Sequence, residues 1–392
     1  MNPPEPQSPF IAIACGGTGG HLFPGLAVAH ELQQYRCDVA LLVSPKEVDR
    51  EAVKSAPGME ILTLPAVALQ GGNYFSFAAS GVKSLFAARK LFRRHRPQAV
   101  LAMGGFTSAA PLLVAKAMGV KTFLHESNSF PGRANRLLSR FVDGAFIGFP
   151  EAGAHLKARK VTVTGTPVRP QFQPRDPAAC RAALGLDPDR LTILVVGGSQ
   201  GASGLNEMIL SALPRLAGKN WQWLHLTGSG DFAKMRAAYA ARGIKAVVKP
   251  FLPEMDLALN AATAAVSRAG ASSLAEMAAM RLPSLLVPFP AAADNHQFLN
   301  AAAFAQNGAA RLLEQRDSTP ERLAAMLTEL AGDSTTRSSV QRALAQRHVP
   351  RAAEQIAERM LDAVARRPAT VPGMNADCGC GHAHGPAKPA TG

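Results

Sequence analysis

Short apolar runs alternate with longer stretches of helical periodicity along almost the whole chain. The runs are rich in Val, Ile, Leu and Ala, and this alternation predicts parallel sheets flanked by helices. In the first half, strands are expected at Phe10–Cys15, Val39–Val43, Ile61–Leu64, Ala99–Met103, Thr122–His125, Gly144–Ile147 and Val161–Thr164. In the second half, they are expected at Leu191–Val196, Trp221–Leu226, Ala246–Val248, Ala264–Ser267, Ser284–Pro288 and Ala310–Leu313.

The strand pattern restarts after a linker. The segment Val168–Pro177 is rich in proline and has little periodicity, which is typical of a linker. The expected division is a first domain over residues 1–168, a linker over 169–180, a second domain over 181–350, a C-terminal helix over 351–367 and a disordered tail over 368–392. We predict an α/β protein of two doubly wound, Rossmann-like domains that face a central cleft, with ligands beyond the carboxyl ends of the strands.

The composition narrows the class of protein. The length of 392 residues suits about two domains. Because 47% of the residues are hydrophobic and 18% charged, each domain can bury a hydrophobic core, and global disorder is excluded. Five cysteines without regular spacing through the body argue against a disulfide framework and for a reducing compartment. The N-terminus lacks the pattern of a signal peptide, and the longest uncharged stretch, 97–115, contains two prolines and a Gly–Gly pair. A cytoplasmic or peripheral protein is expected.

The net charge of +14 favours an anionic partner: nucleic acid, a membrane surface or a phosphorylated substrate. No acidic residue lies between Glu60 and Glu126, and six cations fall between Lys83 and Arg96, including Arg89, Lys90, Arg93 and Arg94. Val82, Leu85, Phe86 and Phe92 would form an apolar stripe beside this basic face on a helix. Such a helix suits an anionic membrane. The alternative is an ordinary surface helix whose stripe packs inward.

Each half opens with a strand and a glycine-rich turn, Gly16–His21 and Gly197–Ala202. Glycine lets the backbone approach a phosphate closely, and a helix N-terminus offers free N–H groups. Neither turn has the spacing of a dinucleotide fingerprint or of a P-loop, which argues against NAD dehydrogenases and nucleoside triphosphatases. The alternative is a tight strand-to-helix turn required only for packing.

Two further sites carry candidate chemistry. Pro24 is expected to start a helix, which would leave His21 on the preceding loop, where it could act as a general base. Alternatively, His21 only caps or packs the turn. Ser272 and Ser273 begin another predicted helix and could hold a pyrophosphate, with Glu276 one turn further to accept from ribose hydroxyls. The alternative there is a capping box, with Ser273 as N-cap and Glu276 at the third helical position.

The run Gly16–Ala29 closely resembles the opening of the MurG family of N-acetylglucosaminyl transferases, which convert lipid I to lipid II in peptidoglycan synthesis. The resemblance continues, in the family's order, in six segments: Met103–Phe106, His125–Asn128, Gly165–Arg169, Gly197–Ala202, Arg268–Glu276 and Asp294–Gln297. It covers about residues 10–365 and implies an inverting GT-B enzyme. The implied donor is UDP-GlcNAc, and the implied acceptor is the 4-hydroxyl of MurNAc in undecaprenyl-diphospho-MurNAc-pentapeptide. No metal or cofactor is implied.

The family's site residues carry over by position. His21 matches the proposed general base. The other matched positions belong to the donor site. At the sugar, the resemblance places Asn128, His296 and Gln297, with Thr18, Gly19 and Gly20 beside the sugar and diphosphate. At the diphosphate it places Arg169, Ser199, Ala271, Ser272, Ser273 and Leu274, at the ribose Glu276, and at uracil the backbone of Leu252. Lys83, Arg89, Lys90, Arg93 and Arg94 would face the membrane.

The implied location is the cytoplasmic face of the inner membrane, as a peripheral protein, with other cell-wall synthesis proteins as candidate partners. One alternative is another UDP-sugar GT-B enzyme, such as a glycolipid glycosyltransferase or a UDP-GlcNAc 2-epimerase. A remote alternative is a nucleic-acid-binding protein, but the sequence shows no recognised motif for it, and no nucleic-acid partner is expected. Cys378, Cys380, His382 and His384 in the tail do not have zinc-finger spacing, and no metal site is assigned to them.

Overall fold

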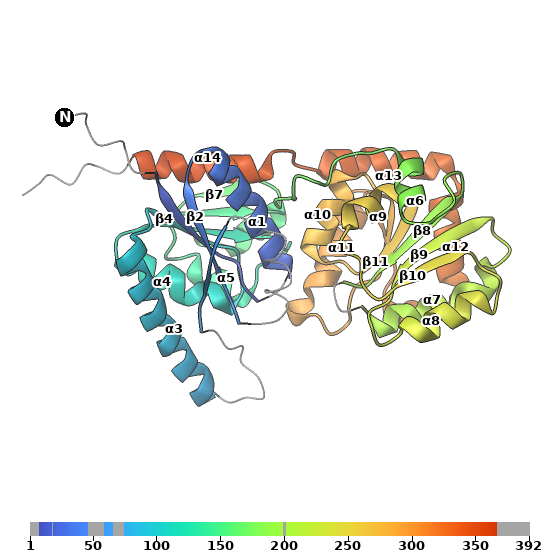
Figure 1. The fold of residues 1–392 in the computed structure, drawn as a ribbon, viewed down its shortest axis with the longest axis horizontal. Helices are drawn as coiled ribbons and strands as arrows, with labels where there is room; N and C mark the ends of the chain where they lie inside the picture. Colours follow the sequence, from blue (N-terminus) through green and yellow to red (C-terminus); the bar gives the residue numbers. More distant parts are fainter. Residues whose placement is uncertain (1–7, 18, 46–58, 66–73, 199–200, 367–392) are drawn as a thin grey trace, which may run out of the picture.

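The computed structural model describes residues 8–17, 19–45, 59–65, 74–198 and 201–366. It contains two parallel sheets placed side by side (Figure 1). In order across the first sheet, the strands are β3 (Glu60–Thr63), β2 (Asp38–Val43), β1 (Phe10–Ala14), β4 (Ala99–Ala102), β5 (Lys121–Glu126), β6 (Gly144–Ile147) and β7 (Val161–Val163). In the second they are β10 (Ala246–Lys249), β9 (Trp221–Leu226), β8 (Leu191–Val196), β11 (Ala264–Ser267), β12 (Ser284–Leu286) and β13 (Arg311–Leu312).

The α/β fold class and all the expected strands are therefore confirmed. The strand order reverses between β1 and β4 in the first sheet and between β8 and β11 in the second, as in doubly wound folds. β1 and β8 are apolar runs buried almost throughout, because helices cover both faces of each parallel sheet. The domain boundaries that we place at residues 168 and 180 stay predictions.

Helices connect the strands in each half. Those of the first half are α1 (Gly19–Gln34), α3 (Tyr74–His95), α4 (Ala109–Ala117) and α5 (Arg133–Leu138). Those of the second half are α6 (Pro177–Ala183), α7 (Ser203–Leu216), α8 (Phe232–Ala240), α9 (Met255–Ala261), α10 (Ala271–Ala279), α11 (His296–Gln306), α12 (Pro320–Gly332) and α13 (Ser334–Arg347). None of the helices in these described ranges is both long and apolar enough to cross a membrane.

The last helix, α14 (Ala352–Ala365), returns to the first half of the chain. It lies along α1 at the top of the first sheet (Figure 1). Ile356, Ala357 and Met360 are fully buried in the same core as Ile11, Ile13 and other side chains of the first sheet. The core of the first half therefore contains side chains from both ends of the sequence.

The two segments that connect the halves touch each other. The chain passes into the second half after β7 and returns after α13, and Gly165 and Val349 meet where these segments pass. A Cβ atom on Gly165 would lie 2.6 Å from Cβ of Val349, and Gly165 has a φ of +77°. Only glycine fits this contact, because a larger residue would be strained and would clash.

Helix α3 does not bury its apolar residues in one stripe. Phe92 and Ala88 are fully buried, but Phe86 is 71% exposed and Val82 50% exposed. The alternative in which the whole stripe packs inward is therefore wrong, because only the C-terminal part of the helix lies against the sheet core. Five cations of this helix are exposed: Lys83, Arg89, Lys90, Arg93 and Arg94.

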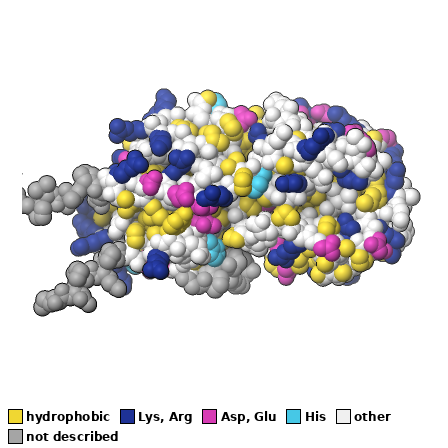
Figure 2. Space-filling view, turned by 90° about the horizontal axis from the view of Figure 1, so that it is seen from above, with side chains coloured by type: hydrophobic (Ala, Val, Ile, Leu, Met, Phe, Trp, Pro, Cys, Tyr) yellow, Lys and Arg dark blue, Asp and Glu magenta, His cyan; other side chains and the backbone are white. Residues whose placement is uncertain are grey.

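Lys and Arg side chains are spread over the surface of the molecule. Seen from the side of α13 and α14, they lie over both halves, and several are close together at the end that contains the first sheet (Figure 2). Acidic side chains are fewer there than cationic ones, which agrees with the excess of cations in the sequence.

Candidate active site between the two halves

The predicted site residues gather where the carboxyl end of the first sheet faces helix α10 of the second. The first glycine-rich turn follows β1, and a Cβ atom on Gly16 would lie 2.4 Å from the backbone nitrogen of Ser44. Glycine is required at this position for packing, as the alternative interpretation of the turn proposed. Thr18 of this turn and Ser199 of the second turn lie outside the described residues.

Helix α1 begins earlier than predicted. Gly19, Gly20 and His21 form its first turn, and Pro24 lies inside it, so the prediction that Pro24 starts the helix after a loop carrying His21 is wrong. Proline has no N–H to donate to the carbonyl oxygen four residues before it, which here belongs to Gly20. That oxygen instead accepts a hydrogen bond from the hydroxyl of Ser272 on α10, at 2.9 Å.

The His21 imidazole packs against the Gly104–Gly105 pair that follows β4. A Cβ atom on Gly104 would lie 3.0 Å from Nε2 of His21, and one on Gly105 would lie 3.2 Å from its Cε1. The half-buried imidazole is therefore enclosed by backbone that only glycine allows to come so close. The local sequence gives no indication that this glycine pair contacts His21.

His125 lies behind this position, at the end of β5. It is completely buried, its Nε2 lies 3.1 Å from the carbonyl oxygen of Gly165, and its Nδ1 lies 3.3 Å from Oγ of Ser127. Burial lowers the pKa of His125 from 6.5 to about 4, and the charge of His21 adds to this effect. His125 is therefore neutral near pH 7 and serves as a hydrogen-bonding group, not as a cation.

Glu126 organises the loop that carries Asn128. Its carboxylate accepts hydrogen bonds from N and Nδ2 of Asn128, at 2.8 and 2.9 Å, from N of Gly132 and from Nδ2 of Asn135. A buried carboxylate with four donors is well satisfied and fixes the loop around it. Of these residues, only Asn128 was predicted as a site residue; Glu126 lies in the same motif and Asn135 lies near it, but neither was predicted.

Arg169, at the start of the linker, forms an ion pair with Glu276 of α10. Nη2 of Arg169 lies 3.2 Å from Oε1 of Glu276, and each side chain is only 13% exposed. The guanidinium also lies over the rings of Phe23 and Phe172, 4.0 and 4.8 Å from their centroids. Burial raises the pKa of Glu276 above its ordinary value, and Arg169 opposes this rise. The structure thus brings together two residues that were predicted as separate ligands.

The N-terminus of α10 carries the predicted diphosphate residues. Gly270 is its N-cap residue and no side chain caps the helix, so the capping box proposed for Ser273 and Glu276 is not formed. The N–H groups of the first turn have no helical acceptor and are suited to an anion. Ala271 and Leu274 are buried under this turn.

The loop before α11 carries the last predicted ligands. Asp294 and Asn295 have left-handed φ values of 46° and 55°, and Asp294 pairs with Arg133 and Arg136 of α5, at 3.0 and 3.3 Å. Oε1 of Gln297 accepts from the backbone N of Ala269 and of Phe289. The buried Nδ1 of His296 has no hydrogen-bond partner among the described residues.

The predicted uracil contact, Leu252, follows β10. Its side chain is 3% exposed and belongs to a core of the second half, whereas the preceding Phe251 is 57% exposed. Only the backbone of Leu252 is therefore available to a ligand.

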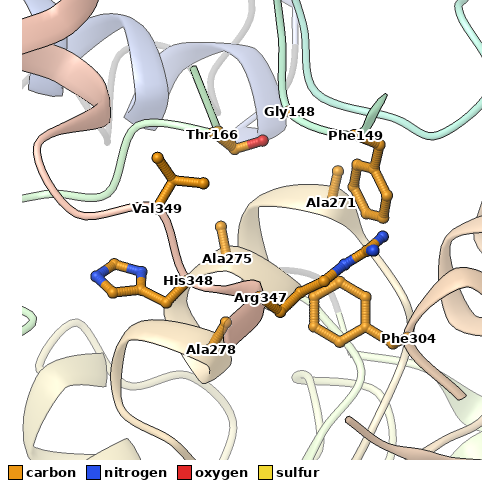
Figure 3. A pocket seen from close by; sticks show the side chains of 11 residues that line it. Gly148, Phe149, Thr166, Ala271, Ala275, Ala278, Phe304, Arg347, His348 and Val349 are labelled. Atoms are coloured by element: carbon orange, nitrogen blue, oxygen red, sulfur yellow. The ribbon is translucent and has the colours of Figure 1, made fainter. Parts of the chain in front are cut away.

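A small cavity lies on the other side of α10, beside the segments that connect the halves. It has a volume of about 30 Å³, room for about two water molecules and not for a nucleotide. Arg347 lies against the rings of Phe149 and Phe304, 4.9 and 5.2 Å from their centroids (Figure 3). This cavity belongs to the packing between the halves and is separate from the predicted ligand positions apart from Ala271.

The described residues contain no group of three or more His, Cys, Asp and Glu side chains that could hold a metal ion. Cys378, Cys380, His382 and His384 lie outside the described residues.

Two family models match the chain. Residues 11–147 match the glycosyltransferase family 28 N-terminal domain, and residues 192–356 match the glycosyltransferase family 28 C-terminal domain. Together with the two facing doubly wound sheets, these matches define the class as glycosyltransferases with the GT-B fold.

Curated relatives narrow this class. The chain is 35% identical over 386 residues to the UDP-N-acetylglucosamine–N-acetylmuramyl-(pentapeptide) pyrophosphoryl-undecaprenol N-acetylglucosamine transferase of Anaeromyxobacter sp. (strain Fw109-5), covering 97% of this chain and 98% of the relative. It is 38% identical over 330 residues to the transferase of the same name from Citrifermentans bemidjiense, covering 82% and 90%. The chain belongs to the MurG family.

Solved structures agree with this assignment. The crystal structure of MurG from Acinetobacter baumannii matches with a TM-score of 0.73 and 28% identity, over 91% of this chain and 99% of that one. A UDP-N-acetylglucosamine 2-epimerase matches with a TM-score of 0.66 over 92% of this chain and 98% of that one. Because its identity is only 13%, that match shows the fold alone.

Proposed function

We propose that this protein transfers GlcNAc from UDP-GlcNAc to the 4-hydroxyl of MurNAc in undecaprenyl-diphospho-MurNAc-pentapeptide. The products are lipid II and UDP, formed with inversion at C1 of GlcNAc during peptidoglycan synthesis. The observation that carries the proposal is the placement of His21 against Gly104 and Gly105, next to Gly20, which contacts Ser272 near the N-terminus of α10. The names of the curated relatives support the same donor and acceptor.

The proposed mechanism assigns one role to each side of the cleft. His21 takes the proton from the acceptor hydroxyl as this oxygen attacks C1 of GlcNAc. The bond from C1 to the diphosphate oxygen breaks, and the leaving UDP gathers negative charge. The N–H groups at the start of α10 and the guanidinium of Arg169 stabilise that charge. Glu276 holds the ribose, and Asn128, His296 and Gln297 hold the sugar.

We further propose that α3 docks the enzyme on the cytoplasmic face of the inner membrane. Its exposed apolar residues lie among cations, and exposed Leu113, Met118, Leu137 and Phe141 lie on or next to α4 and α5 in the same half of the chain. Each basic residue near an anionic membrane contributes ~1 kcal/mol. This arrangement favours membrane docking over a helix that is only solvated. Other cell-wall synthesis proteins are candidate partners at the same membrane.

The direct test is GlcNAc transfer from UDP-GlcNAc to a short-chain lipid I analogue, with EDTA present and a control without acceptor. Disaccharide formation that requires acceptor supports the proposal. Turnover of UDP-GlcNAc without acceptor would instead favour an epimerase, and binding without turnover would indicate a different acceptor or a metal requirement. In the same assay, His21→Ala should abolish most turnover while UDP-GlcNAc still binds; near-normal turnover would exclude His21 as the base.

A further inference from the structure

Asn300 is a completely buried polar side chain at the contact between the two halves. It lies on α11, four residues after His296, and its exposed fraction is 0%. A buried amide is costly unless its hydrogen-bonding groups have partners. All the partners of this amide are loop residues that border the candidate site.

Four hydrogen bonds satisfy the Asn300 amide. Its Oδ1 accepts from N and Oγ of Ser129, at 2.9 and 3.0 Å. Its Nδ2 donates to Oδ1 of Asn128, at 3.1 Å, and to the carbonyl oxygen of Ala269, at 3.2 Å. Three of the four bonds therefore reach the loop of the first half, and one stays within the second half.

The backbone partners fix which way this amide points. The N–H of Ser129 can only donate and the carbonyl of Ala269 can only accept, so only one orientation of the Asn300 amide satisfies both. Nδ2 must then face Asn128, which requires the Asn128 amide to present its oxygen. The Nδ2 of Asn128 is left to donate to Glu126, at 2.9 Å.

We propose that Asn300 is a positioning residue for donor-sugar recognition, which it controls by fixing the amide of Asn128. This inference rests on the proposed function, in which Asn128 contacts the sugar. Asn128 retains one N–H and one oxygen lone pair after its contacts with Glu126 and Asn300, and their directions are set by those two neighbours. A sugar hydroxyl meets both groups already oriented.

The same network couples sugar recognition to the closure of the cleft. Separation of the two halves would break the bonds of Asn300 to Ser129 and Asn128 and leave only the bond to Ala269. The Asn128 amide would then keep only Glu126 as a partner and lose the group that fixes its oxygen. The sugar part of the donor is therefore recognised best in the closed arrangement, whereas UDP has no such requirement at Asn128.

Asn300→Asp tests this role with little change in size. A carboxylate still accepts from Ser129, but it cannot donate to Asn128 or Ala269, and it repels the oxygen that Asn128 presents. The dissociation constant of UDP-GlcNAc should rise about tenfold, the effect of one misplaced hydrogen bond, while that of UDP changes less than about twofold. Ser129→Ala removes one donor to Asn300 and should give a smaller change in the same direction.

The matched control is Asn307→Asp. Asn307 is the C-cap residue of α11, and its Nδ2 donates to the carbonyl oxygen of Ala303 in the same helix, at 2.8 Å, so this bond does not reach the first half. It should leave the ratio of the two dissociation constants unchanged. In a double-mutant cycle, Asn300→Asp should add little to Asn128→Ala, because both act through one amide.

Each outcome decides a different claim. If Asn128→Ala does not change the ratio of UDP-GlcNAc to UDP affinity, the proposed sugar contact of Asn128 is wrong, and the role of Asn300 is wrong with it. If Asn128→Ala changes the ratio but Asn300→Asp weakens both ligands equally, or adds its full effect to Asn128→Ala, Asn300 is only a structural residue. Should Asn300→Asp fail to fold, Ser129→Ala is judged by the same two criteria.

Discussion

The hydroxyl of Ser272 in the second half donates to the carbonyl oxygen of Gly20 in the first half, at 2.9 Å. Gly20 lacks a helical donor because Pro24 stands four residues later. A proline inside one helix thus provides the acceptor that joins it to the other half of the molecule. A hydroxyl has one hydrogen to donate, so Ser272 cannot donate to Gly20 and to a phosphate at the same time.

Ser272→Ala should weaken the contact between the halves. Loss of this hydrogen bond should lower the free energy of unfolding by about 1 kcal/mol and increase the radius of gyration of the unliganded protein in solution scattering. Ser273→Ala is the control, because its hydroxyl has no hydrogen-bond partner among the described residues. If both serines also hold the diphosphate, both variants raise KM for UDP-GlcNAc, but only Ser272→Ala changes the scattering. Equal scattering of the two variants would contradict the role of Ser272 in closure.

Gly104→Ala should impair turnover through His21. The new methyl group would lie 3.0 Å from Nε2 of His21, and the backbone φ of +109° adds strain. Gly119→Ala is the matched control, since Gly119 also has a left-handed φ, +70°, but no atom lies within 4 Å of its added Cβ. We expect kcat to fall at least about tenfold in Gly104→Ala relative to Gly119→Ala. Similar kcat values in both variants would mean that Gly104 is needed only for its backbone conformation and not for the space around His21.

Donor binding should weaken as the pH is lowered, and the midpoint of this loss should lie above the ordinary pKa of a glutamate. Burial raises the pKa of Glu276, and ribose hydroxyls donate better to its ionised form, so affinity is lost as the pH falls through that raised pKa. Uridine is the suitable probe, because it has the ribose without the diphosphate. Arg169→Met removes the charge that opposes the rise and should move the midpoint to higher pH. A midpoint that stays in place, or a pH dependence that persists in Glu276→Gln, would assign the titration to another group.

Charge reversal on α3 should weaken membrane binding. Replacing Lys90, Arg93 and Arg94 with Glu should lower sedimentation with anionic liposomes strongly, since each cation contributes ~1 kcal/mol. The control replaces Lys219, Arg322 and Arg342, which are exposed on the second half, with Glu. It changes the net charge equally, so equal losses in both variants would mean that total charge, not α3, determines binding.

The sequence alone predicted the strands well because a parallel sheet buried on both faces requires continuous apolar runs. It misplaced the start of α1 because proline usually occupies the first helical turn, and the acceptor that tolerates Pro24 deeper in the helix comes from Ser272, more than half the chain away. Asn300 was missed for a similar reason: its partner Ser129 is 171 positions away, and neither residue has a distinctive local pattern.

The sequence also did not predict the ion pairs between distant segments. Arg169 and Glu276 were each recognised through their motifs, but nothing in those motifs says that the two side chains meet. The contact of Asp294 with Arg133 likewise depends on how the halves are placed, which no local periodicity determines.

The return of α14 to the first half has a consequence for biosynthesis. During synthesis the N-terminal half leaves the ribosome first. Its core around β1 and α1, however, is completed by Ile356, Ala357 and Met360, which are made near the end of the chain. The first half therefore cannot reach its final packing during translation of its own residues and stays incomplete until nearly the whole chain has left the ribosome. Premature termination anywhere in the second half would thus expose apolar surface in the first.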